Sequence, residues 1–350
     1  MTPLASAFSL LLLTCGTASA GPALWSGPDA PLPDIPDVSA PSRASDAGLL
    51  DAVTESSTGK TVLSADSCAA LAKQLRALSD WKRAAGEIVP AAPAVFSDGG
   101  RCSAEVQDYL PARPRRVNGK KTFRNGPNCW NNVLFTGNMA QAPRFSAAGE
   151  MTFWMDSPYC RQLGIRETPR PGDIVAMRTS ARKGSRAGAP PEEMHGMVFL
   201  SPELVFSKNT SSKNDPYHMQ RAPLVYQTFH FVSEQCEFVE GTPETCSTWA
   251  NYYRCSDPAA DRQAAYASSP GLAETARKFR LLEDRLSFAV MAGGGPDEEI
   301  TPLLKEVEAL TAETENSAAA PTGQKEEFFS GALLEAMRSA RAQIRTGWKL

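Results

Sequence analysis

The chain has 350 residues, with 36 basic and 39 acidic side chains and a formal net charge of −3. This balance provides no strongly positive surface, so we expect no nucleic-acid partner. No apolar run beyond the N-terminal segment has the length needed to span a bilayer, so we also expect no integral membrane segment.

Residues 1–20 have the pattern of an export signal. A short apolar run at residues 10–13 is followed by Ala-Ser-Ala at residues 18–20, which is typical of a cleavage site. We therefore expect cleavage after Ala20 and a secreted or periplasmic mature chain. Residues 21–60 are rich in Pro, Ala, Ser and Asp, and this composition predicts a disordered linker.

The cysteine count points to a chain with both disulfides and one thiol. Of the 8 cysteines, Cys15 is removed with the signal, which leaves an odd number in the mature chain. Exported proteins pair most cysteines, so the odd one is expected to be reactive or to form an intermolecular bridge. The residues expected in disulfides are Cys68, Cys102, Cys160, Cys236, Cys246 and Cys255, and their connectivity stays open.

The first predicted element is a helix over residues 66–86, because Leu71, Leu75 and Leu78 recur at helical spacing. Ser64 or Asp66 could cap its start. Cys68 lies in its first turn. Residues 87–124 are loop-rich; they contain Cys102, a candidate partner of Cys68, and a small basic patch that we interpret as a solvated loop.

Cys129 lies in the next element, a helix predicted over residues 125–138. The sequence Asn-Gly-Pro-Asn-Cys-Trp at residues 125–130 is a turn that leads into an apolar helical run, with Asn128 as the N-cap and Gly137-Asn138 as the stop. A thiol in the first turn meets unpaired N–H groups and the helix dipole, which lower its pKa. Cys129 is therefore a candidate nucleophile; the competing interpretation places it in a disulfide.

A mixed segment over residues 145–163 is followed by a region of predicted strands. A turn at residues 169–173 precedes them. Strands that follow one another through tight turns predict a mainly antiparallel sheet. The predicted strands are residues 174–177, 194–200, 204–209 and 224–232.

Three histidines are candidate bases, and only one of them stands where a site is expected. His195 begins a strand after a polar loop. His218 is expected on a surface loop, and His230 on the solvent face of the last predicted strand. No Cys-x-x-Cys or His-Glu-x-x-His spacing is present, so we expect neither a metal nor a cofactor.

The C-terminal part has helical spacing at residues 272–291, 300–310 and 328–348. We interpret residues 256–350 as a helical extension, available to pack or to bind a protein partner. Together with a domain over residues 61–255, this predicts an α+β protein.

The order of these motifs resembles the NlpC/P60 papain-like cysteine peptidases and, more loosely, the CHAP amidases. The resemblance rests on the helix-borne Cys129, on Pro-Gly-Asp-Ile-Val at residues 171–175, and on the strand that starts at His195. It implies a papain-like core, with the nucleophile helix packed on an antiparallel sheet. The family's Asp-Cys-Ser-Gly is Asn-Cys-Trp-Asn in this chain, and its His-Val-Gly is His-Gly-Met.

The resemblance also implies a role for each site residue. Cys129 matches the nucleophile, His195 the base and Asn209 the residue that orients the base. Ser207 and Lys208 are the alternatives to Asn209 if the strand register differs. Strand alternation places Ser207 and Asn209 on one face.

The function implied is an exported cysteine hydrolase that cleaves an amide bond, with peptidoglycan or another peptide as substrate. An acyltransferase with the same residues would differ only in its acceptor. The alternative from a different class is a catalytically inactive, disulfide-stabilised envelope binding protein on the same scaffold.

Overall fold

The computed structural model describes residues 50–54, 60–179, 192–234, 248–293, 300–316 and 323–347. The predicted signal peptide, most of the predicted linker, Cys236 and Cys246 lie outside these residues. Within them, no helix is both long and apolar enough to cross a membrane.

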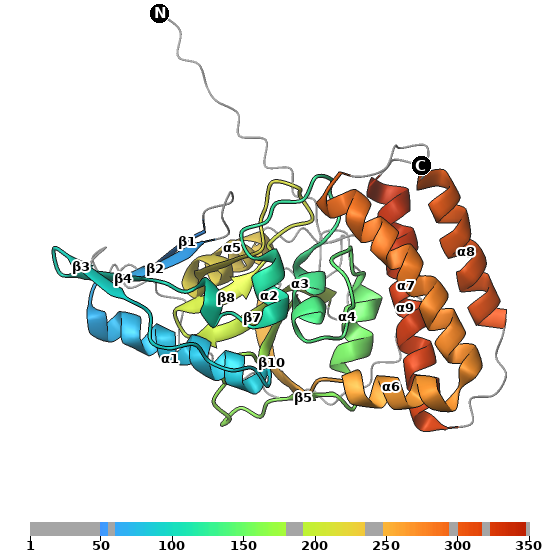
Figure 1. Ribbon diagram of the computed structural model, residues 1–350, viewed down its shortest axis with the longest axis horizontal. Coiled ribbons are helices and arrows are strands. Elements are labelled where there is room, and N and C mark those ends of the chain that lie inside the picture. The colour runs from blue at the N-terminus through green and yellow to red at the C-terminus, as the bar shows by residue number, and fades with distance from the viewer. Residues whose placement is uncertain are drawn as a thin grey trace, which may run out of the picture.

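The described strands form two antiparallel sheets, which confirms the mixed α+β class and the antiparallel pairing. The larger sheet has the order β5-β10-β6-β7-β8-β9. Its strands are β5 (Cys160–Gln162), β6 (Ile174–Thr179), β7 (Glu192–Ser201), β8 (Leu204–Ser207), β9 (His218–Arg221) and β10 (Thr248–Cys255). Helix α3 (Cys129–Thr136) packs on β7, and Figure 1 shows α3 beside this central sheet.

A smaller sheet lies at the N-terminal end and was not predicted. Its strands are ordered β1-β2-β4-β3 and comprise β1 (Asp51–Thr54), β2 (Thr61–Ala65), β3 (Val95–Asp98) and β4 (Arg101–Glu105). The assignment of all of residues 21–60 to a linker is therefore wrong for β1, which pairs with β2. The loop-rich interpretation of residues 87–124 misses β3 and β4, the short helix η1 (Gln107–Tyr109) and α2 (Ala112–Val117).

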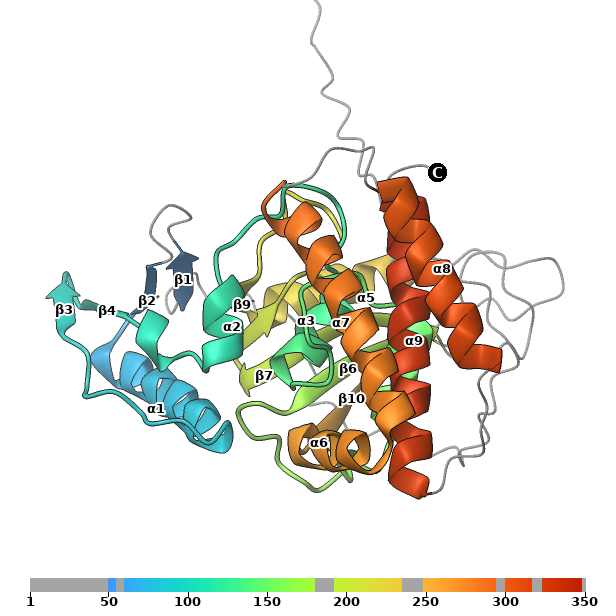
Figure 2. The ribbon, with the colours of Figure 1, turned by 45° about the vertical axis from the view of Figure 1, so that its right-hand side comes forward.

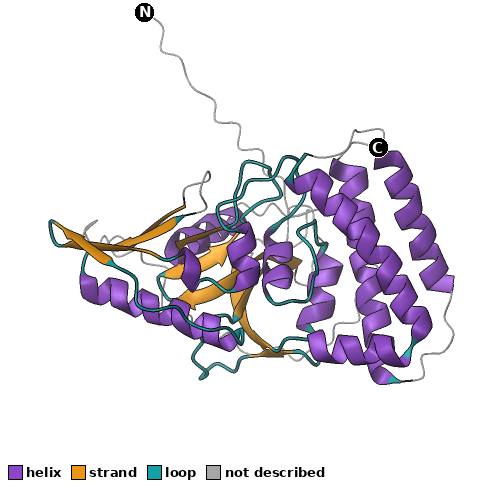
Figure 3. Cartoon of the chain, in the orientation of Figure 1, coloured by secondary structure: helices purple, strands orange, loops and turns teal. Residues whose placement is uncertain are grey.

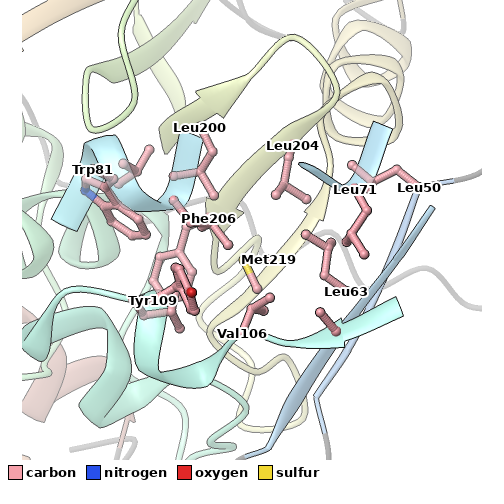
Figure 4. Close-up of a cluster of buried hydrophobic side chains, with 14 of the residues drawn as sticks. Leu50, Leu63, Leu71, Trp81, Val106, Tyr109, Leu200, Leu204, Phe206 and Met219 are labelled. Atoms are coloured by element: carbon pink, nitrogen blue, oxygen red, sulfur yellow. The ribbon is translucent and has the colours of Figure 1, made fainter. Parts of the chain in front are cut away.

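The smaller sheet joins the larger one through an apolar core beneath helix α1 (Cys68–Ala84). Figure 4 shows Trp81 beside Phe206 of β8, with Leu63 of β2 and Met219 of β9 in the same cluster. The N-cap of α1 is Ser67, whose hydroxyl accepts from the N–H of Ala70, rather than the predicted Ser64 or Asp66. Burial of this cluster fixes the two sheets against each other.

Two disulfides bind elements that are distant in sequence. Cys68 pairs with Cys102, its candidate partner from the sequence, and ties α1 to β4. Cys160 pairs with Cys255 and ties β5 to β10. Such links remove conformational freedom from the unfolded chain.

Residues 224–232 form a helix, and the predicted fourth strand is therefore wrong. Helix α5 (Ala222–Glu234) packs Ala222, Val225 and Phe229 against the sheet. These positions are three and four residues apart, which is the spacing of a helix face, and this periodicity overrides the β propensity of Tyr226 and Phe229. His230 accordingly lies in α5 rather than in a strand.

The C-terminal helices pack on the core. They are α6 (Ala259–Ser268), α7 (Pro270–Met291), α8 (Ile300–Asn316) and α9 (Gln324–Gly347), which confirms the helical character of this region. Helix α9 contacts α4 (Ala148–Met155), and Figure 3 shows the helices gathered at one end of the molecule. The extension thus forms part of the wall behind α3.

Candidate active site

Helix α3 begins at Cys129, and its N-terminus is fixed by Asn128. The side-chain oxygen of Asn128 accepts from the N–H of Asn131 at 3.1 Å and from the N–H of Ser146 at 3.2 Å. The predicted cap is therefore confirmed. Because Cys129 occupies the first helical position, the helix dipole favours the thiolate over the thiol.

The segment before α3 is docked on the C-terminal helices. A Cβ at Gly126 would lie 2.2 Å from Nε2 of Gln343 in α9 and 2.9 Å from a methyl of Val290 in α7. Only glycine fits without a shift of these neighbours. This close approach explains the glycine at position 126.

The other end of α3 is held by Arg113 from α2. Its guanidinium donates to the carbonyl of Phe135 and, at 2.7 Å, to the side-chain oxygen of Asn138. It also lies 4.4 Å from the centre of the Phe135 ring. The interpretation of this basic patch as a solvated loop is therefore wrong for Arg113, whose cation satisfies carbonyl groups at the helix C-terminus.

A buried ion-pair cluster supports α3 from behind. Arg144 is 1 % exposed and lies 2.6 Å from a carboxylate oxygen of Glu150 and 2.7 Å from one of Glu283. The backbone N–H of Arg144 donates to the side-chain oxygen of Asn131 in α3. Glu283 belongs to α7, so this cluster joins the C-terminal helices to the nucleophile helix.

The sulfur of Cys129 is buried and takes part in neither of the two disulfides described above. Lys208 is close enough for a Coulombic interaction with it. Burial lowers the pKa of Lys208 to about 8, while attraction to Asp215 and to Cys129 pulls that pKa upward. By reciprocity, the lysine cation favours the thiolate of Cys129.

Strand β7 passes directly against the N-terminal turn of α3. A Cβ at Gly196 would lie 3.6 Å from the carbonyl oxygen of Cys129 and 3.1 Å from a methyl of Val133. The missing side chain allows this approach. His195 is the next residue along β7, so the structure brings its backbone close to the cysteine.

A chain of hydrogen bonds connects His195 to Asn209 through Ser207. Nε2 of His195 lies 3.1 Å from the Ser207 hydroxyl, which donates to the side-chain oxygen of Asn209 at 3.0 Å. Asn209 and Gln220 also exchange hydrogen bonds through their amides. Because the serine proton is directed at Asn209, the imidazole proton is assigned to Nε2, which leaves Nδ1 as an acceptor.

The imidazole of His195 lies under helix α5. Its ring stacks on Phe229 at 3.9 Å between centroids, and His195 is fully buried. Burial lowers the pKa of His195 to about 3, so the ring is neutral at pH 7. Strand alternation turns this ring toward α5, whereas Gly196 faces α3.

The structure thus brings His195, Ser207 and Asn209 together on the α5 face of the sheet, whereas Cys129 lies with α3 on the opposite face. Nδ1 of His195 has no hydrogen-bond partner among the described residues, so no hydrogen bond joins it to the sulfur. Lys208, the other alternative, instead donates to the carbonyls of Ser212 and Asp215. Within the described residues, no group of three or more His, Cys, Asp and Glu side chains could hold a metal.

The sequence missed three contributors to this site. They are Gly196, Gln220 and Phe229. No sequence motif marks their roles, which become visible only once the strands are paired and α5 is packed on the sheet. The surface-loop prediction for His218 is wrong, since it begins β9 opposite Ser207 and burial lowers its pKa. The apolar spacing of α5 was the one available signal for Phe229.

Comparison of the chain with protein-family models, with curated proteins and with solved structures finds no match.

Proposed function

We propose that this protein is an exported cysteine hydrolase of the NlpC/P60-like type that cleaves an amide bond, with peptidoglycan peptides as the expected substrate. The observation that carries the proposal is the state of His195. Its Nε2 is bonded to Ser207 and through it to Asn209, and its Nδ1 remains an acceptor; the adjacent residue of β7, Gly196, contacts the start of α3 from the other face of the sheet. A tethered base with one available nitrogen suits a thiol nucleophile.

The reaction would begin with transfer of the Cys129 proton to Nδ1 of His195. The sulfur then attacks the substrate carbonyl, and the imidazolium returns its proton to the leaving amine. Ser207 and Asn209 hold the ring through Nε2, and a backbone N–H at the start of α3 stabilises the oxyanion. Water hydrolyses the thioester and regenerates the thiol. His195 faces α5 whereas Cys129 lies on the α3 face of the sheet, so the proposed proton transfer requires the imidazole ring to leave its stack on Phe229 and reach the α3 face.

Export is part of the same proposal. Two disulfides fit an oxidising compartment, and the pattern of residues 1–20 fits a cleaved signal. Mass spectrometry of the N-terminus of the mature protein tests this, with Gly21 as the expected first residue.

The complete burial of Cys129 and His195 favours the second candidate, an inactive envelope binding protein on this scaffold. Cys129→Ala separates the two. The hydrolase proposal requires this variant to lose release of peptides from purified peptidoglycan by about 10³-fold or more, with unchanged circular dichroism. Turnover equal to the wild type would refute the nucleophile. Absence of turnover in the wild type, with retained binding, would establish the inactive protein.

A further inference from the structure

A surface pocket of about 500 Å³ lies on the segment that leads into the nucleophile helix. Two loops line it, residues 121–125 before α3 and residues 213–214 between β8 and β9. Figure 2 shows these loops beside the C-terminal end of α7. Pockets of this volume are typical of small-ligand sites.

The walls of the pocket are fixed by hydrogen bonds from main-chain N–H groups. The N–H of Thr122 donates to the carbonyl of Lys213 at 3.2 Å, and the N–H of Lys213 donates to the side chain of Asn125 at 3.0 Å. The N–H of Phe123 donates to the carbonyl of Val290 at 2.8 Å. The pocket is therefore held by three separate parts of the chain rather than by one loop.

The lining is cationic. Lys121, Arg124 and Lys213 contribute positive charge, and no carboxylate is among the described residues that line the pocket. Lys121 and Lys213 form no ion pair within the described residues. The two lysines at one cavity favour an oxyanion over a neutral group.

A buried hydroxyl provides a second observation. Thr122 lines the pocket and is only 6 % exposed, yet its Oγ1 has no hydrogen-bond partner among the described residues. A buried polar atom without a partner costs free energy. A bound oxyanion that accepted a hydrogen bond from this hydroxyl would remove that cost.

We infer that this pocket binds an anionic group of the substrate, a carboxylate or a phosphate, and so selects acidic substrates for the proposed hydrolase. The inference rests on the proposed function. Asn125 is four residues from Cys129, so an extended chain could separate them by no more than about 14 Å. The pocket therefore lies within the length of a short extended peptide from the start of α3.

The first test is calorimetric titration of the full mature chain, in low salt, with inorganic pyrophosphate and separately with glutarate. We expect one of the two to bind, and the tighter one identifies the oxyanion class. Lys121→Ala combined with Lys213→Ala should weaken binding at least about tenfold, and Thr122→Val severalfold, because charge-assisted and neutral hydrogen bonds are lost. Lys120→Ala, an exposed lysine on the same loop outside the lining, should change it less than twofold.

The proposed anion site would be refuted if neither probe bound. It would also be refuted if Lys120→Ala weakened binding of the probe as much as the lysine pair does. Circular dichroism and thermal melting verify that each variant is folded. Binding requires no thiol, so Cys129→Ala must bind the probe as the wild type does. If Cys129→Ala bound the probe and also retained turnover, the proposed hydrolase mechanism would be refuted, whereas the anion site would be supported. If hydrolysis were confirmed but acidic and neutral peptides had equal kcat/KM, the role in substrate selection would fail.

Discussion

The two faces of the larger sheet hold the two halves of the candidate site in different ways. On the α3 face, the cysteine helix is capped at one end, held by Arg113 at the other and backed by the Arg144 cluster. On the α5 face, the His195 ring rests on a short hydrogen-bond chain beneath one helix.

This difference shows that the nucleophile and the base are positioned by separate means. Helix α3 is fixed by packing against elements from the whole chain, so its position should resist small changes. The imidazole depends on Ser207 and on the cover provided by Phe229, so its position and access should respond to single substitutions. The following predictions test that contrast.

The largest effect is expected when the proposed base on the α5 face is removed. His195→Gln should lower kcat/KM for peptide hydrolysis by about 10²- to 10⁴-fold, because the variant lacks the proposed acceptor of the thiol proton. His218→Gln is the matched control, and its effect should remain under about tenfold. Comparable losses in both variants would contradict the assignment of His195 as the base.

The second prediction tests how strongly the buried ion pairs of Arg144 stabilise the α3 face. Arg144→Ala leaves the buried carboxylates of Glu150 and Glu283 without their cation and should cost about 3–5 kcal/mol in the free energy of unfolding. Arg338→Ala removes exposed ion pairs with Glu315 and Glu335 and should cost under about 1 kcal/mol. Chemical denaturation measures both, and equal costs would show that the buried cluster does not stabilise this face.

The pH dependence of stability should distinguish the buried imidazole from the rest of the molecule. The native pKa of His195 is about 3, below the ordinary value of 6.5, so between these values the unfolded chain binds a proton that the folded chain does not. Stability from this residue is complete above pH 6.5 and falls on acidification, by up to about 1.4 kcal/mol per pH unit. Denaturation of the wild type and His195→Gln at pH 7, 6 and 5 measures this, and parallel curves would contradict it.

The smallest effect concerns the cover of the α5 face. Phe229→Ala removes the ring stacked on His195, a contact worth about 0.5–1.5 kcal/mol. Modification of His195 by diethyl pyrocarbonate, followed by mass spectrometry, should therefore accelerate about two- to tenfold. Leu224→Ala on the exposed side of α5 is the control. An unchanged rate for Phe229→Ala would show that α5 does not limit access.

The sequence by itself determined the elements whose signals are local. The N-cap Asn128, the stop at Gly137 and the apolar run between them specify α3, because each interaction lies within one helix. The strand that begins near His195 and the C-terminal helices followed from periodicity for the same reason. The sequence also offered Cys102 as a candidate partner of Cys68, but it left the connectivity open, and the structure decided it.

Only the tertiary structure decided how the site is assembled. The link from His195 through Ser207 to Asn209 depends on the pairing of β7 with β8, and the Phe229 stack depends on α5 forming a helix that the β propensity of its residues opposed. Arg144 and Glu283 meet across 139 positions of sequence. Such contacts are set by burial and by the matching of distant partners, and neither leaves a periodic signal in the sequence.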